Sequence, residues 1–170
     1  MSNQPSSATS ARFPAEYGQK PGQDPDLLPW SHIEERLRSA LNYWLASIAP
    51  SGRPHLRAVD GVWVEGALCF GGSPETRWVR NLEINPAVSI SLPSDAEAII
   101  LEGNVEHITD ASHPLEAAAD AASREKYPQY FTGDTDPPFH PFWALRPSVA
   151  YAWTLADFPN RATRWTFDQP

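Results

Sequence analysis

The chain has 170 residues, a length typical of one domain, with 41% hydrophobic and 20% charged residues, as in ordinary globular proteins. Its formal net charge of −8 argues against broad nucleic-acid binding, which needs a basic face to displace counterions. The sequence has no apolar run near the ~20 residues of a membrane span and no secretory signal pattern, so we expect a cytoplasmic protein without membrane contact.

The chain begins with a segment of low hydrophobicity. Residues 1–29 are rich in Ser, Pro, Gln and Gly, so we expect a flexible arm ahead of one domain over residues 30–170. A helix is predicted at Trp30–Leu41, because its apolar residues recur on one helical face. Ser31 and Glu34 have the spacing of a capping box at its start.

Strand-like sequence follows the first helix. Three strands are predicted, at Asn42–Ala49, His55–Val64 and Ala67–Gly71. Their connections are too short for parallel crossovers, so they form an antiparallel meander. The third strand carries the one cysteine of the chain, Cys69, whose apolar neighbours predict a buried and inert thiol.

The second half of the chain alternates helices and strands. Ser73 suits an N-cap, and Pro74 suits the first position of a helix that ends before Asn85. An alanine-rich helix is predicted at Pro114–Tyr127, followed by a Pro- and Asp-rich loop over residues 128–141. Further strands are predicted at Ala87–Leu92, Ala96–Ile108, Val149–Leu155 and Arg161–Phe167. Six or seven antiparallel strands with short helices at their joints indicate a barrel.

One segment carries residues suited to anion binding. Gly71 and Gly72 precede the predicted helix, on which Arg77 and Arg80 are three apart and therefore share a side. Arg57 lies on the second predicted strand. Free N–H groups at a helix start and guanidinium forks both suit phosphate oxygens. Taken alone, arginines beside two glycines are more typical of a solvated helix face and a turn, so both interpretations stay open at this stage.

Short motifs along most of the chain follow one another in a specific order and spacing. They are Tyr43–Ser47, Gly52–His55, Arg57–Val59, Leu68–Phe70, Thr76–Leu82, Asn85–Pro86, Glu102–Gly103 with Val105, Pro147–Trp153 and Thr163–Phe167. This order resembles the FMN-binding split barrel of pyridoxamine-phosphate-oxidase-like proteins, over roughly residues 30 to 167. The resemblance implies a mainly β fold with short α-helices, a six- to seven-stranded antiparallel split β-barrel.

The resemblance also implies a site for FMN or a deazaflavin (coenzyme F-420). Its implied residues are Arg57, Ala58, Val59, Asp60, Phe70, Gly71, Gly72, Ser73, Thr76, Arg77, Trp78, Arg80, Asn81 and Arg164. By this resemblance Arg57 and Val59 take the family's strand role, and Thr76 and Arg77 its helix role, at the phosphate and ring. Trp78 replaces a lysine of the family, either as a core residue or as a stacking surface. Arg164 is expected near the ring, in its own chain or from the partner of a homodimer with the site at its interface.

The implied function is that of an oxidoreductase, in which the flavin or deazaflavin transfers hydride to or from a small organic substrate. Because the cofactor performs the chemistry, no catalytic residue is assigned. Two alternatives stay open: a non-catalytic module that binds flavin, deazaflavin or haem, and a cofactor-free barrel that acts in protein interaction, which the change at Trp78 favours.

Histidines and acidic residues elsewhere give weaker signals. No two histidines have metal-ligand spacing, so no metal is expected. Asp134, Asp136 and His140 lie in the Pro-rich loop, which we interpret as a solvated turn or as the cap of a substrate pocket. The sequence does not identify the substrate.

Overall fold

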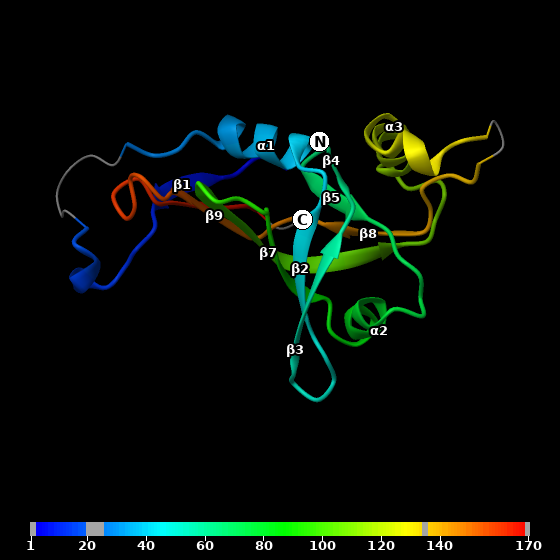
Figure 1. The fold of residues 1–170 in the computed structure, drawn as a ribbon, viewed down its shortest axis with the longest axis horizontal. Coiled ribbons are helices and arrows are strands. Elements are labelled where there is room, and N and C mark those ends of the chain that lie inside the picture. The colour runs from blue at the N-terminus through cyan, green and yellow to red at the C-terminus, as the bar shows by residue number, and fades with distance from the viewer. Residues whose placement is uncertain (1–2, 20–25, 134–135, 169–170) are drawn as a thin grey trace.

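The fold of a computed structural model, which describes residues 3–19, 26–133 and 136–168, is mainly antiparallel β (Figure 1). The strands of the described residues are β1 (Ser7–Ser10), β2 (Tyr43–Ile48), β3 (Pro54–Val59), β4 (Val62–Val64), β5 (Ala67–Phe70), β6 (Ala87–Ser91), β7 (Glu97–Ile108), β8 (Phe142–Leu145), β9 (Val149–Thr154) and β10 (Thr163–Thr166). The helices are α1 (Trp30–Ser39), α2 (Arg77–Ile84), α3 (Glu116–Lys126) and the 3-10 turns η1 (Ala15–Tyr17) and η2 (Pro128–Tyr130). In these residues no helix is long and apolar enough to span a bilayer.

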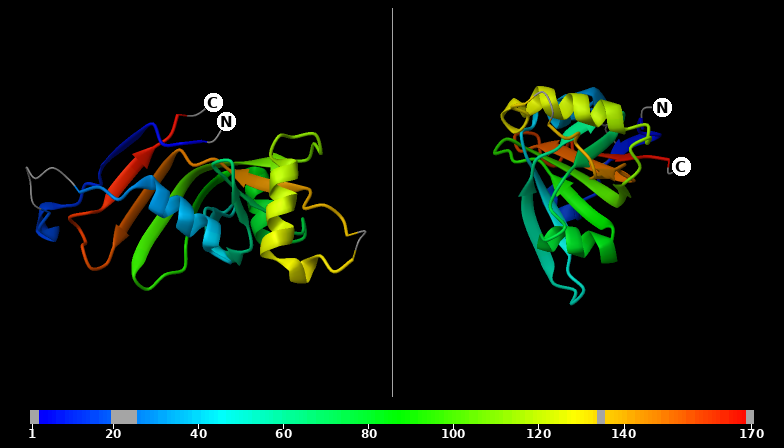
Figure 2. Two further views of the ribbon diagram at one scale, coloured as in Figure 1. Left: turned by 90° about the horizontal axis from the view of Figure 1, so that it is seen from above. Right: turned by 90° about the vertical axis from the view of Figure 1, so that its right-hand side faces the viewer.

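The strands form one bent sheet that does not close. Its main path runs β1-β10-β9-β7-β6-β2-β3, and a branch of β4, β5 and β8 leaves it at β7. The first part of β7 pairs with β6 and β9, whereas Val105–Ile108 pairs with β8. The long strand β7 thus joins the two parts, as the views of Figure 2 show. All pairings are antiparallel, and this open barrel confirms the predicted split-barrel fold.

Two apolar cores hold this arrangement together. The larger core lies inside the curved sheet and is covered by α1, whose Ile33 and Leu37 pack against residues such as Leu45 and Trp165. The smaller core lies between the branch strands and α3, and it includes Cys69. The predicted apolar face of the first helix is therefore the face that α1 buries up to Leu37, whereas Leu41, at the end of the predicted helix, lies beyond α1 and is 65% exposed.

The predicted second strand is interrupted in the structure. Asp60 and Gly61 separate β3 from β4. The Gly61 N–H donates to the Tyr127 hydroxyl at 2.9 Å, and a Cβ at Gly61 would lie 2.9 Å from the Cys69 carbonyl oxygen. The break therefore depends on tertiary contacts with α3 and β5. Together with β1 and β8, which no sequence pattern indicated, it raises the strand number above six or seven.

Both predicted helix caps differ from the structure. Pro29 is the N-cap of α1, and Glu34 accepts hydrogen bonds from Arg38 and from the Trp63 indole, so no capping box forms with Ser31. The second helix begins at Arg77. Ser73 instead lies at the start of a turn, in which its carbonyl oxygen accepts a hydrogen bond from the Thr76 N–H at 3.0 Å.

Part of the predicted N-terminal arm joins the sheet. Strand β1 pairs with β10 from Ser7↔Thr166 to Ser10↔Thr163. Its side chains are small and largely exposed, so the backbone hydrogen bonds to the β10 edge hold it in place. Residues 1–2 and 20–25 of the predicted arm lie outside the described residues.

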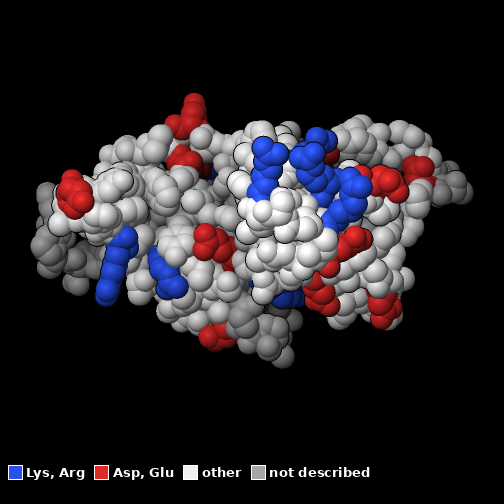
Figure 3. Space-filling view, turned by 90° about the horizontal axis from the view of Figure 1, so that it is seen from below, with Lys and Arg blue, Asp and Glu red and all other residues white. Residues whose placement is uncertain are grey.

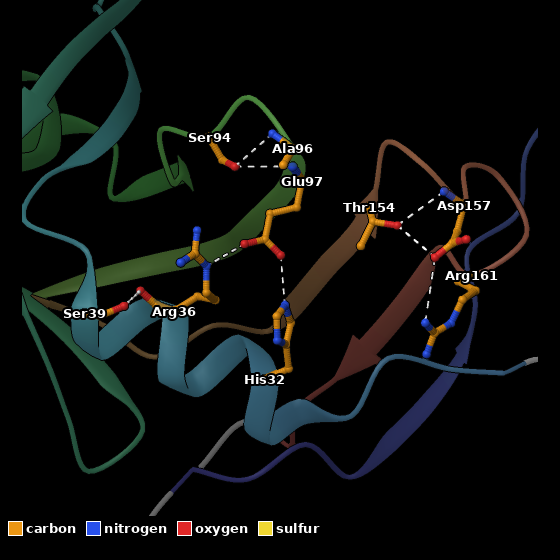
Figure 4. Close-up of polar contacts among 9 residues, drawn as sticks. All are labelled: His32, Arg36, Ser39, Ser94, Ala96, Glu97, Thr154, Asp157 and Arg161. Carbon is orange, nitrogen blue, oxygen red and sulfur yellow. Dashed lines mark hydrogen bonds and ion pairs between the residues drawn. The ribbon is translucent and has the colours of Figure 1, made fainter.

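Helix α1 is fixed to the sheet by a polar cluster at the start of β7. The Glu97 carboxylate binds His32 Nε2 at 2.8 Å and Arg36 Nε through its other oxygen (Figure 4). Burial alone would raise the pKa of Glu97, but the hydrogen bonds from His32 and Arg36 outweigh it and hold this pKa below its usual value. The cluster therefore stabilises the docking of α1 through an ionised carboxylate.

Candidate functional site

Helix α2 docks on β2 through one buried side. Trp78, Val79 and Leu82 are buried, and Asn81 Nδ2 donates to Ser47 Oγ on β2 at 3.1 Å. The opposite side of the helix carries Arg77 and Arg80, which are exposed. The sequence spacing that predicted a shared side for these two arginines thus corresponds to the solvent side of α2.

Strand β3 presents an arginine on the same side of the sheet as α2. Arg57 pairs with Leu45, and His55 pairs with Ser47, across the β2–β3 ladder. Paired residues point to the same face of a sheet, and Ser47 faces α2 because it binds Asn81. Arg57 therefore projects from the sheet edge toward the side on which α2 lies.

We call the surface formed by Arg53, Arg57, Arg77 and Arg80 the basic face. Figure 3 shows basic side chains gathered where the β3 hairpin and α2 lie, with acidic side chains beside them. All four arginines are exposed, and none forms an ion pair within the part of the chain that the structure describes. Four unneutralised guanidinium groups give a protein of net charge −8 a local site for anions.

The structure decides between the two interpretations of Trp78. Its indole is 4% exposed and lies beside the Phe70 ring, with 5.8 Å between ring centroids. A Cβ at Gly72 would come within 2.1 Å of Trp78 Cζ2, so the indole packs directly against the backbone of that glycine. Trp78 is therefore a core residue, and its ring is not free to stack on a ligand.

A pocket of about 380 Å³ lies between α3, the loop after it and the end of β5. We call it the α3 pocket. Its lining residues are Asp60, Gly71, Gly72, Ser123, Tyr127, Tyr130, Phe131, Pro137, Pro138, Phe139, His140 and Pro141. Of the residues predicted in the Pro-rich loop, His140 lies in the wall of this pocket, Asp136 lies in a turn with Gly133 outside the lining, and Asp134 lies outside the described residues.

The structure divides the predicted cofactor residues into several groups. Arg57, Ala58, Thr76, Arg77 and Arg80 lie at the surface of β3 and α2. Asp60, Gly71 and Gly72 line the α3 pocket, whereas Ser73 lies in the exposed turn before α2. Val59, Phe70, Trp78 and Asn81 are buried. The surface and pocket groups adjoin at Gly72, which packs on the Trp78 indole of α2.

Arg164 lies apart from these groups. It is on β10, and its guanidinium group is 6.0 Å from the centre of the Tyr151 ring on β9. Five strand spacings separate β10 from β3, which is about 24 Å along the sheet. In Figure 1, β1 and β9, the strands that flank β10, lie apart from β3 and α2, so one chain does not bring Arg164 to the basic face.

Two other titratable groups, Lys126 and Cys69, are occupied by internal hydrogen bonds or buried. Lys126 donates to the Tyr43 hydroxyl at 3.0 Å and to the Gly61 carbonyl at 2.9 Å, and burial lowers its pKa to about 8. Burial raises the pKa of the Cys69 thiol to about 12, in agreement with the predicted inert thiol. Among the described residues, no group of three or more His, Cys, Asp or Glu side chains is placed to hold a metal ion.

The aromatic walls of the α3 pocket were not indicated by the sequence. Tyr127 is the C-cap of α3, Tyr130 is the last residue of η2, and Phe131 and Phe139 lie in the loop that follows. A signal was present in the four aromatic residues within thirteen positions of an otherwise polar, Pro-rich segment. Only the folded chain places them beside the two glycines after β5.

Comparison with known proteins gives one family. Residues 30–154 match the pyridoxamine 5'-phosphate oxidase family. No curated protein matches the sequence.

Several solved structures have a similar fold. A haem-binding protein from Mycobacterium smegmatis has a TM-score of 0.63 and 23% identity over 82% of this chain and 59% of that chain. An F420 reductase has a TM-score of 0.52 and 24% identity over 69% of this chain and 94% of that chain. A pyridoxamine 5'-phosphate oxidase-related, FMN-binding protein from Nostoc punctiforme has a TM-score of 0.52 and 20% identity over 85% of this chain and 99% of that chain. At such low identities these likenesses show the fold alone.

Proposed function

The chain belongs to the pyridoxamine 5'-phosphate oxidase family, and from that premise we propose that it is an oxidoreductase that uses FMN or a deazaflavin. The substrate class is a small organic molecule. The similar structures support this proposal, because one is an F420 reductase and another is an FMN-binding protein. The bound cofactor supplies hydride transfer, and the protein binds and orients it.

The basic face is the observation that carries the proposal. Its four arginines are exposed and have no acidic partner among the described residues, so they are available to an anionic ligand. A guanidinium fork binds two phosphate oxygens at once, and the N–H groups of the first turn of α2 lie beside it. These donors fit the phosphate of FMN or the phosphodiester of the deazaflavin coenzyme.

The residues have distinct roles in this proposal. Arg57, Arg77 and Arg80 hold the anionic group, and Thr76 at the start of α2 adds a hydroxyl. Gly71 and Gly72, which follow β5, place backbone beside the flat ring, while Phe139 and Trp78 fill the space that side chains would take there. Trp78 acts indirectly, since its buried indole packs against Gly72 and fixes the position of that glycine.

We also propose that the protein is a homodimer with the site at its interface. The outer face of β2 and β3 carries Trp44, Ile48 and Leu56, which are 40%, 43% and 61% exposed. Trp44 pairs with Ala58 and Ile48 with Pro54, so these apolar groups lie on one face. Strand pairing puts Arg164 on this same outer face, so a second copy that covers the face would bring Arg164 to the interface.

The test is a fluorescence titration of the full chain with FMN and, separately, with the deazaflavin coenzyme. We expect Arg77→Ala to weaken binding of the preferred cofactor by about 1.5–3 kcal/mol, or ~10- to ~150-fold in Kd, because it removes a charged hydrogen bond. Arg12→Ala is the matched control, since Arg12 is also exposed but lies beyond β1. Binding of neither cofactor, or equal affinities of the two variants, would contradict the assignment.

A haem-binding module is the second candidate. His55 lies on β3 two residues before Arg57 and faces the same side, and histidine is a common axial ligand of haem iron. One similar structure is a haem-binding protein. Titration with haemin, followed in the Soret band, separates the candidates: a band shift in the wild type that His55→Ala abolishes favours this function.

A further inference from the structure

The α3 pocket is walled mainly by aromatic rings and prolines. Tyr127 and Tyr130 stack with 5.9 Å between ring centroids, and Phe139 stacks on Phe142 at 5.5 Å. Pro137, Pro138 and Pro141 complete the wall on the loop side. A volume of about 380 Å³ is within the usual range of small-molecule pockets, so the space fits a compound with two fused rings.

The loop that forms this wall is fixed to α3. The Phe139 N–H donates to Asp120 Oδ1 at 2.9 Å, and Arg124 donates to the carbonyl groups of Asp136 and Pro137. Arg124 also pairs with Asp120, so its charge is already neutralised. Because these contacts are internal to the protein, the pocket is formed before any ligand binds.

Two polar groups of the pocket lack a full set of hydrogen-bond partners. Asp60 Oδ2 accepts a hydrogen bond from the Tyr130 hydroxyl at 2.8 Å, and Oδ1 has no partner among the described residues. The Ser123 hydroxyl lies at the α3 side of the pocket, is buried, and also has no partner there. Asp60 is exposed, so its free oxygen is open to a ligand, whereas the buried Ser123 hydroxyl without a partner costs free energy.

The pocket and the basic face have opposite preferences for charge. The lining contains the Asp60 carboxylate and no lysine or arginine. His140, the one histidine of the lining, is held by Glu116 Oε2 at 3.0 Å and by the Thr109 carbonyl at 3.2 Å. An anionic ligand would therefore meet a carboxylate at this position, whereas an amine or amidine would bind it.

We propose that the α3 pocket is the substrate subsite and that it takes a planar aromatic compound with a cationic or N–H donor group and no phosphate. Asp60 accepts the donor group, and the rings of Tyr127 and Phe139 enclose the plane. The inference rests on the proposed function for one point, that Gly71 and Gly72 place the pocket beside the cofactor ring. The chemistry of the pocket itself is independent of the cofactor.

The test compares two probes of the same shape and opposite charge. Naphthalene-2-carboxamidine and naphthalene-2-carboxylate are titrated by calorimetry into the cofactor-free full chain. We expect the amidine to bind at least tenfold more tightly than the carboxylate. Equal affinities, tighter binding of the carboxylate, or binding of neither probe would overturn the proposal.

Three variants then locate the bound probe. Asp60→Asn should weaken amidine binding about tenfold and reduce its advantage over the carboxylate, because a neutral amide replaces the charged acceptor. Asp95→Asn, an exposed carboxylate in the turn before β7, is the matched control and should change nothing. An Asp60→Asn variant with wild-type affinity for the amidine would place the probe elsewhere and overturn the inference.

Arg77→Ala separates this inference from the proposed function. We expect it to weaken cofactor binding and to leave amidine binding unchanged. If the wild type binds the amidine as described but neither cofactor, the proposed function fails and the pocket assignment stands. If Arg77→Ala weakens the amidine as much as Asp60→Asn does, the probe binds at the basic face and the pocket assignment fails.

Discussion

Gly72 shows how a single position can serve both packing and function. It lies at the rim of the α3 pocket, and the Trp78 indole fills the space where a side chain would be. Since the indole is 4% exposed, it has little room to move away. In this chain the tryptophan therefore fixes the position of the glycine-bearing turn, a role that the lysine expected there could not fill from the interior.

We predict that Gly72→Ala lowers the free energy of unfolding by about 1–3 kcal/mol, the usual effect of overpacking. The added Cβ would come within 2.1 Å of Trp78 Cζ2, so the turn or the indole must shift. Urea unfolding followed by tryptophan fluorescence measures the change. Gly133→Ala is the control, because its Cβ would meet its nearest atom, Asp136 Oδ1, at 3.4 Å. Equal stabilities of the two variants would show that the turn adapts.

At the scale of elements, one carboxylate adds a polar contact to the apolar docking of α1. Glu97 joins His32 and Arg36 to the start of β7, and the pKa of Glu97 lies below its usual value because their hydrogen bonds outweigh burial. We predict that Glu97→Gln lowers the free energy of unfolding by about 1 kcal/mol at pH 7. Glu106→Gln, an exposed position on the same strand, should have no such effect.

The pH dependence has a definite sign. A folded-state pKa below the unfolded one gives stability that is fully present above the unfolded value of about 4.3 and is lost as the pH falls through the folded value. The difference between wild type and Glu97→Gln should therefore be constant near neutral pH and shrink below about pH 4. Thermal unfolding from pH 3 to pH 7 measures it, and a difference that grows toward acid would contradict this role.

Patterns local in sequence predicted most elements of the fold. Periodicity and turn residues predicted the apolar face of α1 and the strands β2, β5, β6 and β9. They also predicted that α2 and α3 end at or near prolines. The break at Gly61 was not predictable, because it depends on the Tyr127 hydroxyl sixty-six positions away. Strand β1 was missed because Ser7–Ser10 has no apolar alternation and is held by the edge of β10.

The same distinction applies to the site. Arg77 and Arg80 were predictable, since helical spacing alone puts them on one side. The burial of Trp78 and Asn81 was not, because it depends on how α2 turns toward β2. The α3 pocket joins residues from the break after β3 to the loop before β8, and no local sequence pattern predicts that contact.

For the whole molecule, the two faces of β3 differ in character. Arg57 projects to the side of α2, whereas Leu56 projects to the outer face with Trp44 and Ile48. An apolar group of this kind at the edge of a sheet is typical of a protein interface. Dimerisation through this apolar group would cover the exposed edge strand β3 and would place the basic face of each chain next to the interface.

We therefore predict that Leu56→Glu converts a dimer to a monomer. Leu56 is 61% exposed, so the change should leave the fold of one chain intact, while two carboxylates brought to a symmetric interface would repel each other and lose their water. Light scattering coupled to size-exclusion chromatography gives the mass, and circular dichroism checks the fold.

Leu155→Glu is the matched control, because Leu155 is 60% exposed in the turn after β9, away from the outer face of β2 and β3. A dimer that survives Leu56→Glu but dissociates with Leu155→Glu would move the interface to the β9–β10 end. A monomeric wild type would require a site built from one chain, without Arg164.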